Sequence, residues 1–171
     1  MNKVELKKFA VEARRDLIEK VSLKAEQYGI TKDNIELNVV EEYGQLIVNG
    51  REYPIEISHP LHTLERRLKS IGYEQLIEEV AYTWFNRINA IFYMEVKGYL
   101  PEKVTILSST TGKAEPDILS QYETMNLSID LREIAKLKQE GRIDSAYKML
   151  FVSTCNNLSE SLPTLFEKIN D

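Results

Sequence analysis

Apolar residues recur at helical spacing over most of the chain. The first segment runs from a capping pair at Asn2 and Glu5 to a stop at Gly29. Its apolar stripe consists of Leu6, Phe9, Ala10, Ala13, Leu17, Val21, Ala25 and Tyr28. Further helices are predicted over residues 59–71 and 130–141, and again from residue 143. The pattern therefore predicts a mainly α protein.

The longest and most apolar segment runs from Tyr73 to Lys97, and Gly98 ends it. Its main stripe consists of Ile77, Val80, Ala81, Trp84, Ile88, Ile91 and Phe92. Other faces of the segment are apolar too, and a helix that is apolar on most sides belongs in the middle of a bundle. We therefore expect a helical bundle around a long central helix at about 73–97, with Trp84 in the core.

One small β-hairpin is predicted over about 46–55. The dipeptide Asn49-Gly50 suits a two-residue type I′ turn, because both central positions of that turn need positive φ. Such a turn would place four side chains on the face to be buried, namely Leu46, Val48, Tyr53 and Ile55. Pro54 lacks a backbone N–H, which favours an edge position for its strand. Residues 31–43 are weakly patterned and fit either a helix or irregular chain.

Composition and charge narrow the class of protein. The 171 residues include 22 basic and 27 acidic side chains, for a net charge of −5, so no general basic coat is available for nucleic acid. We find no linker and no repeat, which predicts a single domain over 1–171. The longest apolar run, at 90–94, is far shorter than the ~20 residues that span a bilayer. Cys155 cannot form an internal disulfide, so we expect a cytoplasmic protein with no membrane segment.

Most catalytic signatures are absent from the sequence. It contains no Gly-x-Gly, so it lacks the glycine loop that binds dinucleotides or S-adenosylmethionine. The segment Thr111-Gly112-Lys113 faintly resembles a phosphate loop, but Leu107 and Ala114 stand where that loop needs Gly and Ser or Thr. His59, His62 and the distant Cys155 make a poor zinc set, because structural zinc takes four ligands. The sequence thus predicts no catalytic, cofactor-binding or metal-binding residue.

A polar stripe interrupts the central helix. Tyr82, Asn86, Asn89 and Tyr93 follow one another at spacings of 4, 3 and 4, and Arg87 flanks them. Buried amides and a guanidinium need partners, because an unpaired buried polar group costs about 1–3 kcal/mol. The stripe fits either a hydrogen-bonded network that fixes helix packing, or the polar wall of a cleft or docking surface.

Basic side chains provide the other candidate contacts. Three of them, Arg66, Arg67 and Lys69, lie on one predicted helix and form either a solvated face or a patch that contacts phosphates. A second group lies in the first helix and consists of Lys3, Lys7, Lys8, Arg14 and Arg15. The candidate DNA or partner contacts are Arg66, Arg67, Lys69, Asn86, Arg87, Asn89, Tyr93 and Lys113.

The stretch Glu78–Arg87, which reads EEVAYTWFNR, begins a series of specific motifs. The series continues through Tyr93–Val96, Gly98–Pro101, Ile106–Ser109, Glu115–Ile118, Cys155-Asn156, Leu162-Pro163 and Leu165–Ile169. Together these segments resemble the N-terminal region of the PglX-type adenine-specific DNA methyltransferases of BREX phage-defence systems. The match is densest over about 65–118. Phe92 departs from the family, in which a basic residue is common at this position.

The resemblance implies a parent enzyme that transfers methyl from S-adenosylmethionine to N6 of adenine in DNA. Such enzymes carry a glycine-containing cofactor motif and an Asn/Asp-Pro-Pro-Tyr/Phe motif that holds the flipped adenine. Neither motif occurs here, and each of the five prolines stands alone. We therefore expect the non-catalytic, leading helical segment of a longer methyltransferase of a restriction-modification-like system.

Two interpretations of the role follow. In the first, this accessory domain helps to hold DNA, weakly or indirectly, or a partner subunit of the defence system, while the parent protein uses S-adenosylmethionine. In the second, the chain is a free-standing α-helical interaction module with no enzymatic role.

Overall fold

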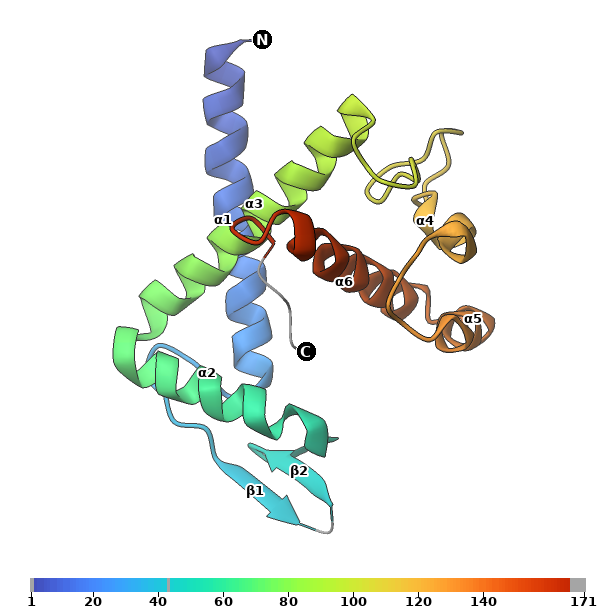
Figure 1. Cartoon of the computed structure of the whole chain (residues 1–171). Coiled ribbons are helices and arrows are strands. Elements are labelled where there is room, and N and C mark those ends of the chain that lie inside the picture. Colours follow the sequence, from blue (N-terminus) through green and yellow to red (C-terminus); the bar gives the residue numbers. More distant parts are fainter. Residues whose placement is uncertain (1, 43, 167–171) are drawn as a thin grey trace. The chain divides into compact units, whose positions relative to one another are not determined.

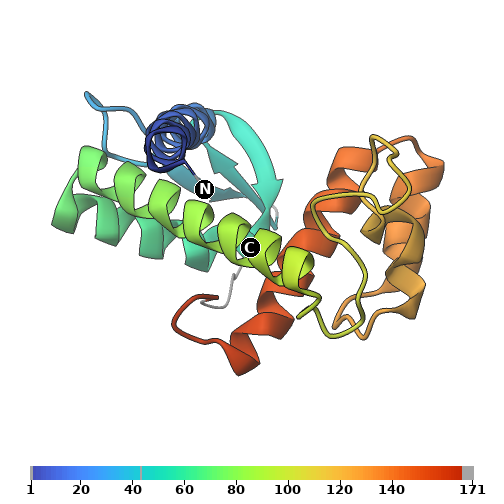
Figure 2. The ribbon, with the colours of Figure 1, turned by 90° about the horizontal axis from the view of Figure 1, so that it is seen from above.

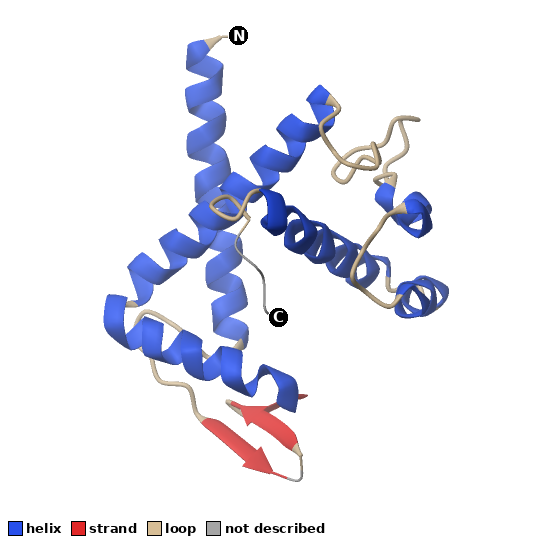
Figure 3. Cartoon of the chain, in the orientation of Figure 1, coloured by secondary structure: helices blue, strands red, loops and turns tan. Residues whose placement is uncertain are grey.

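The computed structural model describes residues 2–42 and 44–166, and Figures 1 and 3 show its elements. Its α-helices are α1 (Lys3–Gln27), α2 (Ser58–Ile71), α3 (Tyr73–Lys97), α4 (Ile118–Gln121), α5 (Leu131–Gln139) and α6 (Ile143–Ser161). The strands are β1 (Val39–Glu42), β2 (Gln45–Val48) and β3 (Arg51–Pro54), and two 3-10 turns are η1 (Ile55–Ile57) and η2 (Tyr122–Thr124). The predicted fold class, mainly α with one small antiparallel element, is confirmed. None of the described helices combines the length and the apolar character that crossing a membrane requires.

The chain divides into two compact units, and the boundary falls between Phe85 and Asn86, inside α3. Unit 1 comprises the described residues up to Phe85, and unit 2 those from Asn86. The single domain over 1–171 stays a prediction.

Unit 1 is built on a three-stranded antiparallel sheet in the order β1-β2-β3. The predicted hairpin is confirmed in its register, with Leu46 opposite Tyr53 and Val48 opposite Arg51. Leu46 and Val48 are fully buried and join a core cluster with Ile30, Leu37, Leu61, Leu68 and Leu76. The side chains of the sheet, α2 and the start of α3 thus share one hydrophobic core.

Two sequence expectations for this sheet are wrong. We expected a helix or irregular chain over residues 31–43, but residues 39–42 form strand β1. Pairing with β2 supplies the hydrogen bonds of this strand, and the local sequence pattern does not predict that pairing. Ile55 lies in η1 rather than in a strand and is exposed, because the strand ends at Pro54.

The end of α1 is tied to the hairpin turn. Asn49 and Gly50 have φ of 48° and 78°, the positive values that the predicted turn needs. The Asn49 side-chain amide donates to the Tyr28 carbonyl at the end of α1. Gly29, at φ 76°, lies so close that a Cβ there would collide with the Asn49 amide. Glycine at position 29 thus suits the backbone conformation and also leaves room for the Asn49 amide to bond to the end of α1.

Unit 2 contains the second half of α3, then α4, η2, α5 and α6. Its buried side chains include Ile91, Ile106, Ile118, Ile134, Leu150, Cys155 and Phe166. Burial raises the pKa of the Cys155 thiol to about 12, an effect that the charge of Arg87 opposes. The thiol is free and fully buried.

The bounds predicted for the central helix are confirmed, but one side of α3 is open. Tyr82, Phe92, Tyr93 and Val96 are exposed, and Trp84, which we expected in the core, is only partly buried. A helix with apolar residues on most sides is normally packed against other elements on most sides, but no described residue packs over this side of α3.

We expect Gly29→Ala to destabilise the protein more than Gly141→Ala. Both glycines end a helix with positive φ and the same pair of backbone hydrogen bonds, and a Cβ at Gly141 meets open space. Each change should cost about 1–2 kcal/mol for the left-handed backbone. Gly29→Ala should cost about 0.5–1.5 kcal/mol more, because the Asn49 hydrogen bond is lost. Urea unfolding measures both, and equal losses would show that the collision is relieved without breaking that bond.

Candidate docking site

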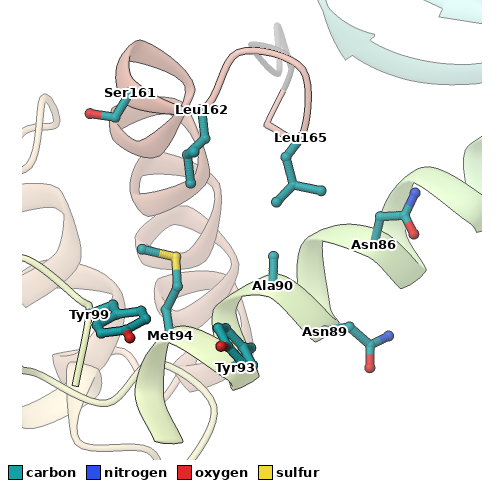
Figure 4. Close-up of a pocket in the computed structure, with 9 residues that line it drawn as sticks. All are labelled: Asn86, Asn89, Ala90, Tyr93, Met94, Tyr99, Ser161, Leu162 and Leu165. Carbon is teal, nitrogen blue, oxygen red and sulfur yellow. The ribbon is translucent and has the colours of Figure 1, made fainter. Parts of the chain in front are cut away.

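Unit 2 carries an open groove of about 680 Å³ between α3 and the end of α6 (Figure 4). One wall is a face of α3, and the other is the last residue of α6 with the turn that follows it. The lining residues are Asn86, Asn89, Ala90, Tyr93, Met94, Tyr99, Ser161, Leu162 and Leu165. In Figure 4, Leu162 and Leu165 point toward α3, where Ala90 and Met94 face them.

Local rules place each wall of the groove. The α3 residues recur at spacings of three and four, so that they share one helix face. Gly98, at φ 67°, ends α3 and brings Tyr99 back toward Tyr93, with ring centroids 6.2 Å apart and an edge-on geometry. On the other wall, Pro163 cannot continue α6, and the fully buried Phe166 anchors the turn that carries Leu165.

The groove is apolar and open to solvent. Tyr93 is 56% exposed, Tyr99 62% and Leu165 37%. The Lys97 ammonium lies 6.0 Å from the centre of the Tyr93 ring. Phe92 and Val96, on the same stretch of α3, are exposed as well. Apolar patches of this kind on a soluble protein mark places where another molecule docks.

Two carboxylates fix the loop that follows α3. Glu95 accepts hydrogen bonds from the backbone N–H groups of Ile106 and Leu107, the latter at 2.5 Å, and from the Ser108 hydroxyl at 3.1 Å. Asp117 accepts from the Ser109 hydroxyl at 2.8 Å, and from the Thr110 N–H and hydroxyl at 2.9 and 2.6 Å. The bonds from Thr110 and Ser109 lower the pKa of Asp117 from 3.8 to about 2.

This arrangement argues against phosphate binding at the loop around Lys113. A phosphate loop needs backbone N–H groups that are free to point at the anion. Here the N–H groups of Ile106, Leu107 and Thr110 already donate to carboxylates. Lys113 itself is exposed. Among the described residues, no group of three or more His, Cys, Asp or Glu is placed to hold a metal ion.

The basic patch predicted on α2 is largely paired with acid. Arg67 lies 2.5 Å from Glu79 and Lys69 lies 2.8 Å from Glu65, while Arg66 donates to the Thr63 hydroxyl at 3.2 Å. Each paired carboxylate cancels the charge that a phosphate would need. The three bases therefore form a poorer phosphate patch than the sequence suggested.

The structure separates the members of the predicted polar stripe. Asn86, Asn89 and Tyr93 line the groove, as the cleft interpretation expects. Arg87 is 6% exposed and is therefore buried rather than available at the surface. A contact role for these residues stays a prediction, and Arg87 is inaccessible to a partner in this structure.

Comparison with curated proteins relates the whole chain to two enzymes. It is 38% identical to "Adenine-specific methyltransferase PglX" of Lacticaseibacillus casei (strain Zhang) and 31% identical to "Adenine-specific methyltransferase BrxX" of Escherichia coli O9:H4 (strain HS). Both matches cover 100% of the chain. The chain is a homologue of part of the PglX-type adenine-specific methyltransferases. The resemblance stated from the sequence is thus confirmed. The chain spans 16% of the length of PglX and 15% of that of BrxX, and no protein-family model matches it.

Sequence reasoning missed several residues that shape this PglX-related segment. Glu95 and Asp117 organise the loop, and Leu162 and Leu165 complete the groove. Asp117 follows by seven and eight residues the two hydroxyl groups whose hydrogen bonds it accepts. A polar loop that ends in an acidic residue could therefore have predicted these bonds from the sequence. No local pattern could have predicted that the two leucines line the groove, because the α3 residues opposite them lie about 70 residues away in the sequence.

We expect Asp117→Asn to remove an acid-sensitive part of the stability. The pKa of Asp117 is lower in the folded state, so the carboxylate stabilises the fold above pH 4, and this contribution disappears as the pH falls through about 2. An asparagine would place an NH2 group against the Thr110 and Ser109 donors. Urea midpoints between pH 1.5 and 7 should show the variant less stable than the parent near pH 7 and nearly equal to it near pH 1.5. A constant difference would contradict this role.

Proposed function

We propose that the chain is a non-catalytic docking region of a cytoplasmic, S-adenosylmethionine-dependent, adenine-specific DNA methyltransferase of a phage-defence system. The whole-length match to about one-sixth of two adenine-specific methyltransferases supports the parentage. The open apolar groove of unit 2 is the observation that carries the docking role.

The chemistry of the groove supports binding rather than catalysis. The described residues that line it offer two amides, two phenols and a hydroxyl among aliphatic side chains, and they include neither a carboxylate nor a histidine for proton transfer. The sequence lacks both the glycine loop and the Pro-Pro pair of such methyltransferases. The catalytic residues of the enzyme would accordingly lie in other parts of it.

We infer that the groove binds an apolar protein segment, which the remainder of the methyltransferase supplies. The relatives have more than four-fifths of their length outside the matched region, so such a segment would be tethered near the groove. Exposed tyrosines beside aliphatic side chains are typical of the energetic centres of protein interfaces. A partner subunit of the defence system would need the same chemistry, and DNA, a polyanion, fits this groove poorly.

Combined Tyr93→Ala and Leu165→Ala substitutions should weaken binding of the chain to a PglX-type methyltransferase that lacks the matched segment. Loss of a buried interface anchor costs about 2 kcal/mol or more, which corresponds to a Kd at least about 30-fold higher. Tyr82→Ala is the matched control, because Tyr82 is an exposed tyrosine of the same helix outside the groove. Calorimetry measures both. If the parent chain does not bind, or if Tyr82→Ala weakens binding equally, the free-standing module becomes the better interpretation.

The isolated chain should neither bind S-adenosylmethionine nor methylate DNA. The missing glycine loop and the missing Pro-Pro pair are the physical reasons. Calorimetry with the cofactor tests binding, and transfer of a labelled methyl group to duplex DNA tests activity. Micromolar affinity for the cofactor would contradict the non-catalytic assignment.

A further inference from the structure

The first half of α1 presents an uncovered basic face. The structure describes all residues of α1, and none of them is buried. Its first turns extend away from the sheet and α2 of the same unit (Figure 1), and Figure 2 looks nearly along the helix. A shallow groove runs along one face of these turns, and Lys3, Lys7, Lys8 and Arg15 are among the residues that line it. Among the described residues, Glu12 is the one acid that lines it.

The cations on this face are available, in contrast to those of α2. Among the described residues, Lys3 and Lys7 form no ion pair. Lys8 and Arg15 have only long, exposed contacts within α1, at 3.8 Å to Glu12 and 3.6 Å to Asp16. Exposed pairs of this kind contribute little, with a median of about 0–1 kcal/mol. The pairs of Arg67 and Lys69 are also partly exposed, but they are shorter, at 2.5 and 2.8 Å. Their acidic side chains are also less exposed, at 38% and 20% against 52% for Glu12 and 59% for Asp16.

Duplex DNA offers enough phosphates over the length of this face for each of its cations. Residues 3 to 15 of a helix span ~18 Å. One strand of duplex DNA carries a phosphate every ~3.4 Å of axis, or about five over that length. The two strands together offer more phosphates over that length than this face has cations, so each of the four cations can reach a phosphate. Val4 and Val11, both exposed and between the charges, would lie against the sugars.

We propose that this face of α1 binds the phosphate backbone of duplex DNA without reading its sequence. The inference rests on the proposed function, since an adenine-specific DNA methyltransferase works beside this polyanion. It goes further by assigning the contact to α1 rather than to α2. The binding is electrostatic, because backbone contacts position a protein on DNA and carry no base information.

The test compares two triple variants that remove equal charge. One is Lys3→Gln, Lys7→Gln and Arg15→Gln, and the control is Arg66→Gln, Arg67→Gln and Lys69→Gln. Fluorescence anisotropy measures binding of the 171-residue chain to a labelled 20-base-pair duplex from 25 to 200 mM salt. Circular dichroism checks that both variants keep the parent's helix content, which is expected because Gln is a good helix former.

Four phosphate contacts predict a log–log salt slope of about −3.6 for the parent chain, or about 150-fold weaker binding at 200 than at 50 mM. The α1 variant should keep about one phosphate contact and therefore show a slope near −0.9. The slope of the α2 control should differ from that of the parent chain by no more than about 1. The proposal is overturned if the parent does not bind at 25 mM salt, if binding depends on sequence, or if the α2 control flattens the slope as much as the α1 variant.

The outcome is independent of the groove in unit 2. Tyr93→Ala with Leu165→Ala should leave the DNA salt slope unchanged, and the α1 variant should still bind the truncated methyltransferase. An α1 variant that binds DNA like the parent would overturn the assignment and favour an acidic protein segment on this face. Failure of the groove variant alone would leave the DNA assignment standing.

Discussion

The Glu95 carboxylate determines the course of the chain beyond α3, and the rest of unit 2 depends on it. By accepting the N–H groups of Ile106 and Leu107, it holds the loop against the last turns of the helix. Ile106 is then fully buried, and its carbonyl accepts the Tyr147 hydroxyl of α6 at 3.1 Å. This links α3 to α6, whose end forms the second wall of the groove. One charged side chain thus satisfies backbone groups that would otherwise be left unpaired on partial burial.

The same carboxylates limit the chemistry of the loop. An anion-binding loop and an acid-stabilised loop compete for the same backbone donors, so the bonds to Glu95 and Asp117 argue against anion binding here. Acidic side chains likewise occupy the donors of α2, where Arg67 and Lys69 form ion pairs with Glu79 and Glu65. On the face of α1 that carries Lys3, Lys7, Lys8 and Arg15, Glu12 is the one acid among the described lining residues, whereas Arg14, outside this face, is paired with Glu78 at 2.7 Å. Net charge alone, at −5, describes none of these local differences.

The two surfaces suit different partners for physical reasons. The groove offers aromatic and aliphatic side chains, whose burial is favourable wherever the partner is apolar. The face of α1 offers flexible cations, which gain by releasing counterions from a polyanion and lose that gain as salt rises. Since they lie in different units, each can be altered without touching the side chains of the other.

The sequence by itself determined the features that rest on interactions between near neighbours. The bounds of α3, the Asn49-Gly50 turn and the Asn2 cap, whose side chain accepts from Val4, follow from preferences that act within a few residues. The relationship to the methyltransferases was also readable from motifs. Only the tertiary structure decided which bases are neutralised, that residues 39–42 form a strand, and that Leu165 meets α3. Arg67 and Glu79 are 12 residues apart, and Leu165 lies about 75 residues from Ala90 of α3. Strand β1 exists only through its pairing with β2. These contacts are set by the packing of the whole unit rather than by local preference.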